Sequence, residues 1–289
     1  MKGVTMPFIE VVIPLVMLFF SVVIARWLRH RKVKHYVMSG NYTMNYQPMV
    51  LEGNIVALEA LISLPAELID DGQNKEDVID YIERHAMGNS FTPAVFRTVL
   101  RDYIHHFRER TDLIVSINVP PQDICDDSLV NYALDSLRNA GIPAGTFMLE
   151  VTERTRIPSK SQFIHNLNRL REGGFLLAID DAGKGLSEDI IALRFPFDYV
   201  KTEIAMLKRQ RTEFKDNSLW NAIQDARTGV IVERIQTAGD AGLAKEMCNQ
   251  PLLQGWYFFQ AIPARDAAEL LLQPVDPTNQ NIKRGYNAG

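Results

Sequence analysis

The sequence predicts an α/β protein, a closed TIM-like (β/α)8 barrel preceded by a single transmembrane helix. Three observations lead to this prediction. An almost uninterrupted apolar segment lies near the N-terminus. After it, eight short runs rich in β-branched and aromatic residues alternate with amphipathic stretches of helical period. Most of those runs carry polar side chains near their C-terminal ends, where barrel enzymes hold their active sites.

The apolar segment covers residues 7–25, PFIEVVIPLVMLFFSVVIA, and approaches the ~20 residues that span a bilayer. Lys2 precedes it, whereas basic residues follow at positions 26, 29, 31, 32 and 34. By the positive-inside rule, the chain after this segment is expected in the cytoplasm. A cleaved signal peptide is the alternative interpretation, but its basic residues would precede the apolar run, and no small-x-small cleavage motif follows.

The composition argues against several classes of protein. Charged residues make up 23% of the chain and the net charge is −4, which disfavours a disordered chain. A binder of nucleic-acid polymers would usually be basic. Cys125 and Cys248 lie far apart and lack metal-ligand spacing, so we expect reduced structural thiols, as in a cytoplasmic domain.

The chain is expected to have three regions. Residues 1–40 would form the anchor and a basic juxtamembrane segment, residues 41–275 the barrel, and residues 276–289 a flexible tail. Alternation with helical stretches implies that the strands run parallel. The eight strands are expected at 46–50, 56–62, 113–119, 147–153, 175–181, 198–204, 229–235 and 252–259.

Polar residues recur along seven successive strands. A single strand-end carboxylate is more often a helix cap or a solvated turn residue. Because the C-terminal ends of barrel strands meet at one mouth, the repeated pattern predicts that these side chains converge. The residues are Glu59, Asn118, Glu150 with Glu153, Asp180 with Asp181, Lys201, Glu233 and Gln254.

This set of side chains predicts a site for divalent cations. So many carboxylates in a partly dry pocket could not all stay ionised without cations. The ligands would be hard oxygens, which favours Mg²⁺ or Mn²⁺ over zinc. Asp180 could bridge two ions about 3.5–4 Å apart, with Asp181 on one of them, an arrangement that suits in-line displacement at phosphorus. Both aspartates face one site only if the strand ends between them, an exit that Gly183 and Gly185 permit.

Lys201 is the cation of this set. It could form a structural ion pair, or it could orient the attacking hydroxide and stabilise charge that develops on phosphate. Glu203 shares its strand face and could hold it in place. The tetrapeptide AGKG at 182–185 suggests a phosphate loop, but the complete G-x-x-x-x-G-K-[ST] pattern is absent and we reject that interpretation.

In their order along the chain, several motifs resemble the EAL domain of bacterial cyclic di-GMP phosphodiesterases, from Tyr46 to about Pro263. These are YQPMV, LEALIS, SIN, LEVTE, DDAGKG, VK, VIVE and QGWYF. The resemblance implies a barrel that hydrolyses cyclic di-GMP to pGpG with two Mg²⁺ or Mn²⁺ ions. It also implies the metal ligands, which are Glu59, Asn118, Glu150, Asp180, Asp181 and Glu233.

The resemblance implies further roles for residues around these ligands. Catalysis would depend on Glu59, Lys201, Glu233 and Gln254, with Lys201 acting on the nucleophilic water. Substrate contacts would come from Gln47, Leu61, Gln254 and the position of Ser63. The loop after the fifth strand would be supported by Glu153, Gly183, Gly185 and Glu203.

Several positions depart from the EAL pattern. Ser63 stands where the family has an arginine that grips a substrate phosphate, and loss of that contact would weaken binding by about 1.5–3 kcal/mol. The family's DDFGTG loop reads DDAGKG, so Ala182 and Lys184 replace an aromatic residue and a hydroxyl. Three smaller departures are Glu203 for aspartate, Gln236 for a carboxylate and Ala261 for proline.

The preferred hypothesis is a single-pass phosphodiesterase of the bacterial inner membrane, with its barrel in the cytoplasm. It would lower the level of cyclic di-GMP and act as a homodimer. The alternative is a catalytically inactive EAL-like regulator that binds cyclic di-GMP or a protein partner, which Ser63 and the altered loop favour. A third hypothesis is another Mg²⁺-dependent barrel, of the enolase type.

Overall fold

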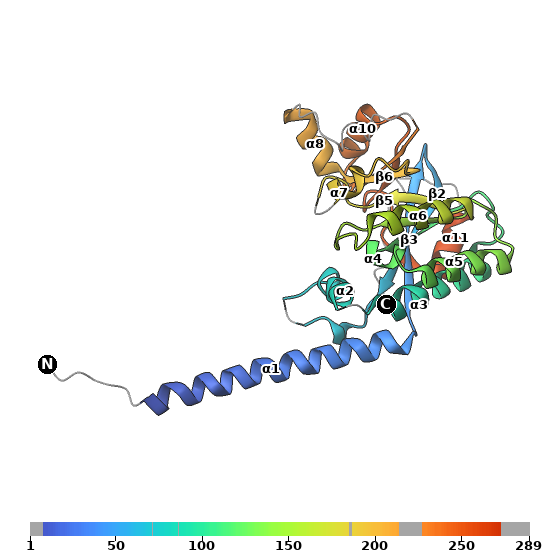
Figure 1. Cartoon of the computed structure of the whole chain (residues 1–289). Helices are drawn as coiled ribbons and strands as arrows, with labels where there is room; N and C mark the ends of the chain where they lie inside the picture. The colour runs from blue at the N-terminus through green and yellow to red at the C-terminus, as the bar shows by residue number, and fades with distance from the viewer. Residues whose placement is uncertain (1–7, 71, 86, 185–186, 214–226, 273–289) are drawn as a thin grey trace.

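A computed structural model of the chain describes residues 8–70, 72–85, 87–184, 187–213 and 227–272 (Figure 1). Three expectations lie wholly or mostly outside these residues. They concern Gly185, the amphipathic helical stretch at 217–229 expected just before the seventh strand, and the tail at 276–289.

The first helix, α1 (Phe8–Ser39), extends away from the rest of the molecule (Figure 1). Its part from Val12 to Ser39 is long and apolar enough to cross a membrane, with a mean hydropathy of 1.9 in its most apolar window. Large side chains such as Phe19 and Phe20 are exposed there, whereas Val33 and Val37 are buried against the following domain. Among the described residues, the apolar half of α1 is therefore exposed, and its last turns pack on the domain.

The first two strands form an antiparallel hairpin, so the expectation of an all-parallel sheet was wrong for the first strand. β1 (Thr43–Leu51) pairs with β2 (Asn54–Ser63) over their whole length. Only Glu52 and Gly53 connect them, with φ of 48° and 85°, as a two-residue hairpin turn requires. A parallel pair needs a crossover of a dozen or more residues, which this connection cannot provide.

The remaining strands run parallel from β2 to β8, and β1 closes the barrel between β8 and β2. The closed barrel predicted from the sequence is confirmed. A short β9 (Ile262–Pro263) pairs with the outer part of β1. The parallel strands after β2 are β3 (Ile114–Val119), β4 (Phe147–Val151), β5 (Leu176–Ile179), β6 (Tyr199–Glu203), β7 (Gly229–Glu233) and β8 (Leu252–Gln254).

Helices cover the outside of the barrel, where a large apolar core fills the space between them and the strands. Side chains fix several helix starts. For example, Asn74 and Thr237 each form a capping box with the aspartate three residues later. The helices are α2 (Lys75–Arg84), α3 (Gly88–Asp102) with its continuation η2 (Tyr103–Phe107), α4 (Pro121–Ile124), α5 (Asp127–Ala140), α6 (Lys160–Glu172), α7 (Ser187–Ile191), α8 (Ile204–Glu213), α10 (Ala238–Met247) and α11 (Ala264–Leu271), with a short turn η1 (Ala66–Leu68) before α2.

Candidate active site

The polar residues form a layer directly above an apolar floor inside the barrel. Side chains two positions apart on a strand share a face, so six of the polar residues lie two positions after an inward-facing apolar residue. The floor consists of a small buried cluster with the partly buried Tyr199 packed against it. Pairs of floor and site residues are Ala57 and Glu59, Met148 and Glu150, Ala178 and Asp180, Tyr199 and Lys201, Ile231 and Glu233, and Leu252 and Gln254.

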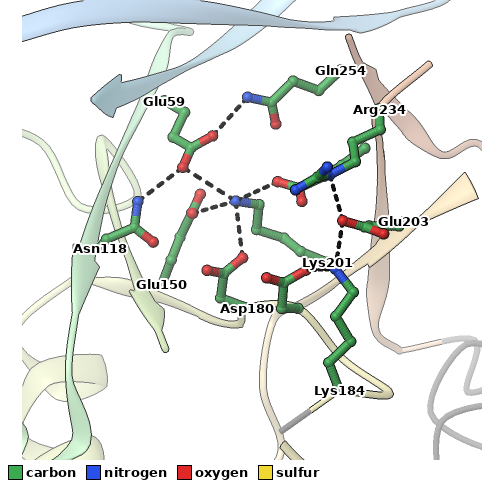
Figure 2. A network of polar contacts seen from close by, with 11 residues as sticks. Glu59, Asn118, Glu150, Asp180, Lys184, Lys201, Glu203, Arg234 and Gln254 are labelled. Carbon is green, nitrogen blue, oxygen red and sulfur yellow. Dashed lines mark hydrogen bonds and ion pairs between the residues drawn. The ribbon is translucent and has the colours of Figure 1, made fainter. Parts of the chain in front are cut away.

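Lys201 lies at the centre of this layer, between four carboxylates (Figure 2). Its Nζ lies 2.5 Å from Glu150 Oε2, 2.7 Å from Glu233 Oε1, 3.2 Å from Asp180 Oδ1 and 3.4 Å from Glu59 Oε1. Burial opposes the charged form, but the carboxylates outweigh it and hold the pKa of Lys201 well above its ordinary value. Lys201 is therefore a hydrogen-bond donor and a positive charge at neutral pH, and not a base.

Two amide side chains donate hydrogen bonds to Glu59. Asn118 Nδ2 lies 2.8 Å from Oε1, and Gln254 Nε2 lies 2.7 Å from Oε2 (Figure 2). These bonds and Lys201 offset the effect of burial and lower the pKa of the Glu59 carboxyl. Because each amide uses its nitrogen on Glu59, its oxygen remains as an acceptor. Among the described residues, the buried Gln254 Oε1 has no hydrogen-bond partner.

Asp180 also belongs to a second group of carboxylates, with Asp181 and Glu153. One oxygen from each lies within 4.8 Å of the other two. β5 ends at Ile179, and Asp181 itself adopts a left-handed conformation with φ of 46°. Aspartate tolerates this region better than most residues do. The chain thereby turns both aspartates toward one site, and Asp180 lies between the two groups.

The donor set suits hard divalent cations. Four carboxylates surround a single ammonium, and Glu150 Oε1 is buried without a hydrogen-bond partner in the described part of the chain. Burial raises the pKa of Glu150 and Asp180, and it raises that of Glu233 to about 8, with Lys201 opposing. Carboxylate and amide oxygens are the ligands that Mg²⁺ and Mn²⁺ accept. Bound cations would therefore stabilise this cluster of carboxylates.

A cavity of about 630 Å³ opens above the layer. Its lining includes Glu59, Asp180 and Lys201, and also side chains from β1, α2 and α3. The apolar side chains that these three elements contribute are Met44, Ile79, Ile82, Phe91 and Val95, next to polar ones such as Lys75 and Glu83. The cavity thus combines charged and apolar side chains, as small-molecule sites commonly do.

The family model of the EAL domain matches residues 30–261. The chain belongs to the EAL domain family. This result confirms the resemblance seen in the sequence motifs. It also removes the basis for an enolase-type barrel, which rested only on the types of residue at the strand ends.

Two relatives and one solved structure are similar to this EAL domain. The cyclic di-GMP phosphodiesterase NbdA of Pseudomonas aeruginosa is 28% identical over 237 residues, covering 79% of this chain and 30% of NbdA. The cyclic di-GMP phosphodiesterase PdeB of Shewanella oneidensis is 28% identical over 141 residues, covering 44% of this chain and 16% of PdeB. The chain therefore spans less than a third of the length of either relative.

The solved structure is the PaMucR phosphodiesterase in a cyclic di-GMP complex. It superposes with a TM-score of 0.68 at 18% identity and covers 83% of this chain and 99% of that chain. At this identity the similarity shows the fold.

The residues expected to contact the substrate or to support Lys201 lie at different distances from the cavity. Gln47 and Leu61 line the cavity, whereas Ser63, at the end of β2, is not among its lining residues. The expectation that Glu203 holds Lys201 is not met among the described contacts, because Glu203 pairs with Lys184 and Arg234 instead. Glu203 lies beyond the layer of Lys201, at the last position of β6.

Three basic residues of the cavity were not predicted from the sequence. They are Lys75, Arg154 and Arg234. Arg154 directly follows Glu153, and its guanidinium faces Glu83 and Asp80 of α2 at 3.8–3.9 Å. Its position after a strand-end glutamate was a signal available in the sequence. The position of Lys75 depends on how α2 packs, which the sequence did not indicate.

Glu83 leads to a prediction about pH. Its side chain is buried and lines the cavity, and burial raises its pKa to about 7, partly offset by Arg154. An unfolded glutamate titrates near 4.5, so the native state prefers the neutral form. The neutral form of Glu83 therefore contributes fully to the free energy of unfolding below about pH 4.5. This contribution is lost as the pH rises through about 7.

We therefore expect Glu83→Gln to raise the free energy of unfolding by about 3 kcal/mol at pH 8 and by much less at pH 5. Urea denaturation of the full chain in detergent at both pH values measures the difference. An equal effect at the two pH values contradicts the buried, neutral carboxyl.

Proposed function

We propose that this EAL domain hydrolyses cyclic di-GMP to linear pGpG with two divalent cations. The main support is the layer around Lys201, where carboxylates from four strands lie within 3.4 Å of one ammonium. The names of NbdA and PdeB support the choice of substrate. Cations would be held by Glu59, Asn118, Glu150, Asp180, Asp181 and Glu233, with Gln254 beside them.

The reaction adds water across one phosphodiester P–O bond, which gives a 5′-phosphate and a free 3′-hydroxyl. Bound Mg²⁺ or Mn²⁺ would supply charge neutralisation at the phosphate and lower the pKa of the attacking water. The protonated Lys201 Nζ would donate a hydrogen bond to the attacking oxygen and stabilise charge in the transition state. Glu59 is held rigid by two amides and Lys201, as a preorganised site requires.

We also propose that α1 anchors the domain in the bacterial inner membrane with the barrel in the cytoplasm. Its exposed apolar half and the basic residues that follow support this topology. Assembly into a homodimer and binding of a protein partner stay predictions from the sequence.

A regulator without turnover is the second candidate. The contact of Lys184 with Asp181 favours it, because a positive charge already neutralises one expected ligand. The deciding experiment incubates the full chain in detergent micelles with cyclic di-GMP and Mn²⁺ and analyses the nucleotides by chromatography. Accumulation of pGpG supports the enzyme, and binding of intact cyclic di-GMP without product supports the regulator. Absence of both rejects cyclic di-GMP as the ligand.

Trp256 gives a prediction about substrate binding. Its side chain is 69% exposed at the cavity, directly after Gly255, whose close approach to the Ile235 backbone leaves no room for a Cβ. Stacking of a base on an aromatic ring contributes about 1–3 kcal/mol, so Trp256→Ala should raise KM for cyclic di-GMP about tenfold or more. Trp256→Phe is the control and should keep most of the affinity. If KM is unchanged in Trp256→Ala, the ring does not contact the substrate.

A further inference from the structure

Four charged side chains form a continuous chain of ion pairs along the rim of the cation site. Lys184 Nζ lies 3.0 Å from Asp181 Oδ1 and also contacts Glu203 Oε1. Arg234 Nε contacts the same Glu203 oxygen. Figure 2 shows Glu203 between Lys184 and Arg234, beside the cluster around Lys201. The chain of ion pairs therefore connects the ends of β5, β6 and β7.

The loop after β5 fixes Lys184 above Asp181. The Lys184 backbone N–H donates to the Asp181 carbonyl at 3.1 Å, which closes a tight turn. The Ser187 hydroxyl donates to the Lys184 carbonyl at 2.6 Å and accepts from the Gly183 N–H at 3.0 Å. With its backbone held on both sides, the Lys184 ammonium has two carboxylates within reach, Asp181 and Glu203.

Asp181 cannot serve an ammonium and a divalent cation equally well. A lysine charge about 3 Å from a ligand oxygen occupies part of the space of a cation and repels it. Glu203 offers the alternative position for Lys184, so the ammonium can leave Asp181 without losing its ion pair. Arg234 already shares Glu203, which weakens the attraction that Glu203 exerts on Lys184.

We propose that Lys184 competes with a divalent cation for Asp181 and so lowers the affinity of the site for the second of the two ions. Glu203 opposes this effect, because it offers Lys184 a different ion-pair partner. The inference rests on the proposed two-cation site and deepens it, because it assigns the control of cation affinity to one residue. A lysine at this position would make activity depend on a higher concentration of free Mg²⁺ or Mn²⁺.

The test is calorimetric titration of Mn²⁺ into the full chain in detergent, without nucleotide. We expect Lys184→Thr to tighten the weaker of the two binding events about tenfold and to leave the tighter one nearly unchanged. Lys245→Thr is the matched control, because this exposed lysine lies in the last turn of α10, away from the barrel mouth. Lys245→Thr should leave the affinity of both Mn²⁺ binding events unchanged. Thermal unfolding of each variant shows that the fold is intact.

A second pair of variants separates competition from a general charge effect. Glu203→Gln should weaken binding of the second Mn²⁺ in the wild-type background, because Asp181 is then the remaining carboxylate partner of Lys184. In the Lys184→Thr background the same change should have a much smaller effect. Equal effects in both backgrounds, or no tightening in Lys184→Thr, overturn the proposal.

The outcomes also distinguish this proposal from the proposed function. If Mn²⁺ binds and Lys184→Thr tightens it, the competition is established even when no pGpG forms. If pGpG forms but Lys184→Thr leaves Mn²⁺ binding unchanged, the competition is rejected and the enzyme stands. If no variant binds Mn²⁺, the competition is rejected together with the cation site.

Discussion

Replacing Lys201 with methionine is expected to lower the free energy of unfolding by about 3–5 kcal/mol in metal-free buffer at pH 8. The Lys201 ammonium is fully buried and lies within 3.4 Å of four carboxylates. Methionine has a similar volume but no charge, so the carboxylates would face one another in a dry site. Removing one partner of a buried ion pair is costly because the other partner stays buried without compensation.

Two conditions should reduce this loss of stability. At pH 5 more of the carboxyls would be protonated, since burial raises the pKa of Glu150, Asp180 and Glu233. Saturating Mn²⁺ would replace the missing positive charge. Urea denaturation of Lys201→Met at pH 5 and pH 8, with and without Mn²⁺, measures both effects. A variant as stable as wild type in metal-free buffer at pH 8 contradicts the buried charge cluster.

Replacing Asp180 with asparagine is expected to reduce turnover of cyclic di-GMP by about 10³-fold or more, since a cation contact supplies several kcal/mol of transition-state stabilisation. Asp180 lies between the cluster around Lys201 and the group formed with Asp181 and Glu153. Asparagine keeps the shape of the side chain but removes the charge that cations require. The loss should therefore appear in kcat and in Mn²⁺ affinity together.

The same change should preserve or increase stability in metal-free buffer. Burial raises the pKa of Asp180, and the neighbouring charges of Glu59 and Asp181 add to this effect against the opposing Lys201. Removing one of four negative charges relieves that repulsion. Asp135→Asn, on an exposed face of α5, is the control and should change neither activity nor stability. A large fall in the melting temperature of Asp180→Asn would show that the carboxylate is structural.

The position of the site could be predicted from the sequence because strand periodicity places it. Glu150 and Lys201 interrupt apolar runs at the same face as the floor residues two positions earlier, and a closed barrel brings them together. The antiparallel β1 was also readable, since the strands expected at 46–50 and 56–62 leave only five residues between them, too few for the crossover that a parallel pair needs. The alternation of strands and helical stretches along the rest of the chain led to the prediction of a parallel sheet, which is wrong for this first pair.

Other features depend on packing and loop conformation, which residue types do not specify. Lys184 reaches Asp181 only because Asp181 takes a left-handed conformation and Ser187 holds the turn. Arg234 pairs with Glu203 from a backbone φ of 57°, a value that the sequence does not suggest for arginine. These contacts join the ends of neighbouring strands, so they form only in the assembled barrel and cannot be predicted from any single strand.

Binding of divalent cations by side chains from the ends of five strands, β2, β3, β4, β5 and β7, is the proposal on which the other predictions depend. Electron paramagnetic resonance of Mn²⁺ titrated into the full chain tests it most directly, because bound Mn²⁺ loses the sharp signal of the free ion. We predict two bound Mn²⁺ ions per chain at saturation, and weaker uptake by Asp180→Asn. A signal that grows in proportion to added Mn²⁺ from the first addition, as in buffer alone, would show that these side chains hold no cation.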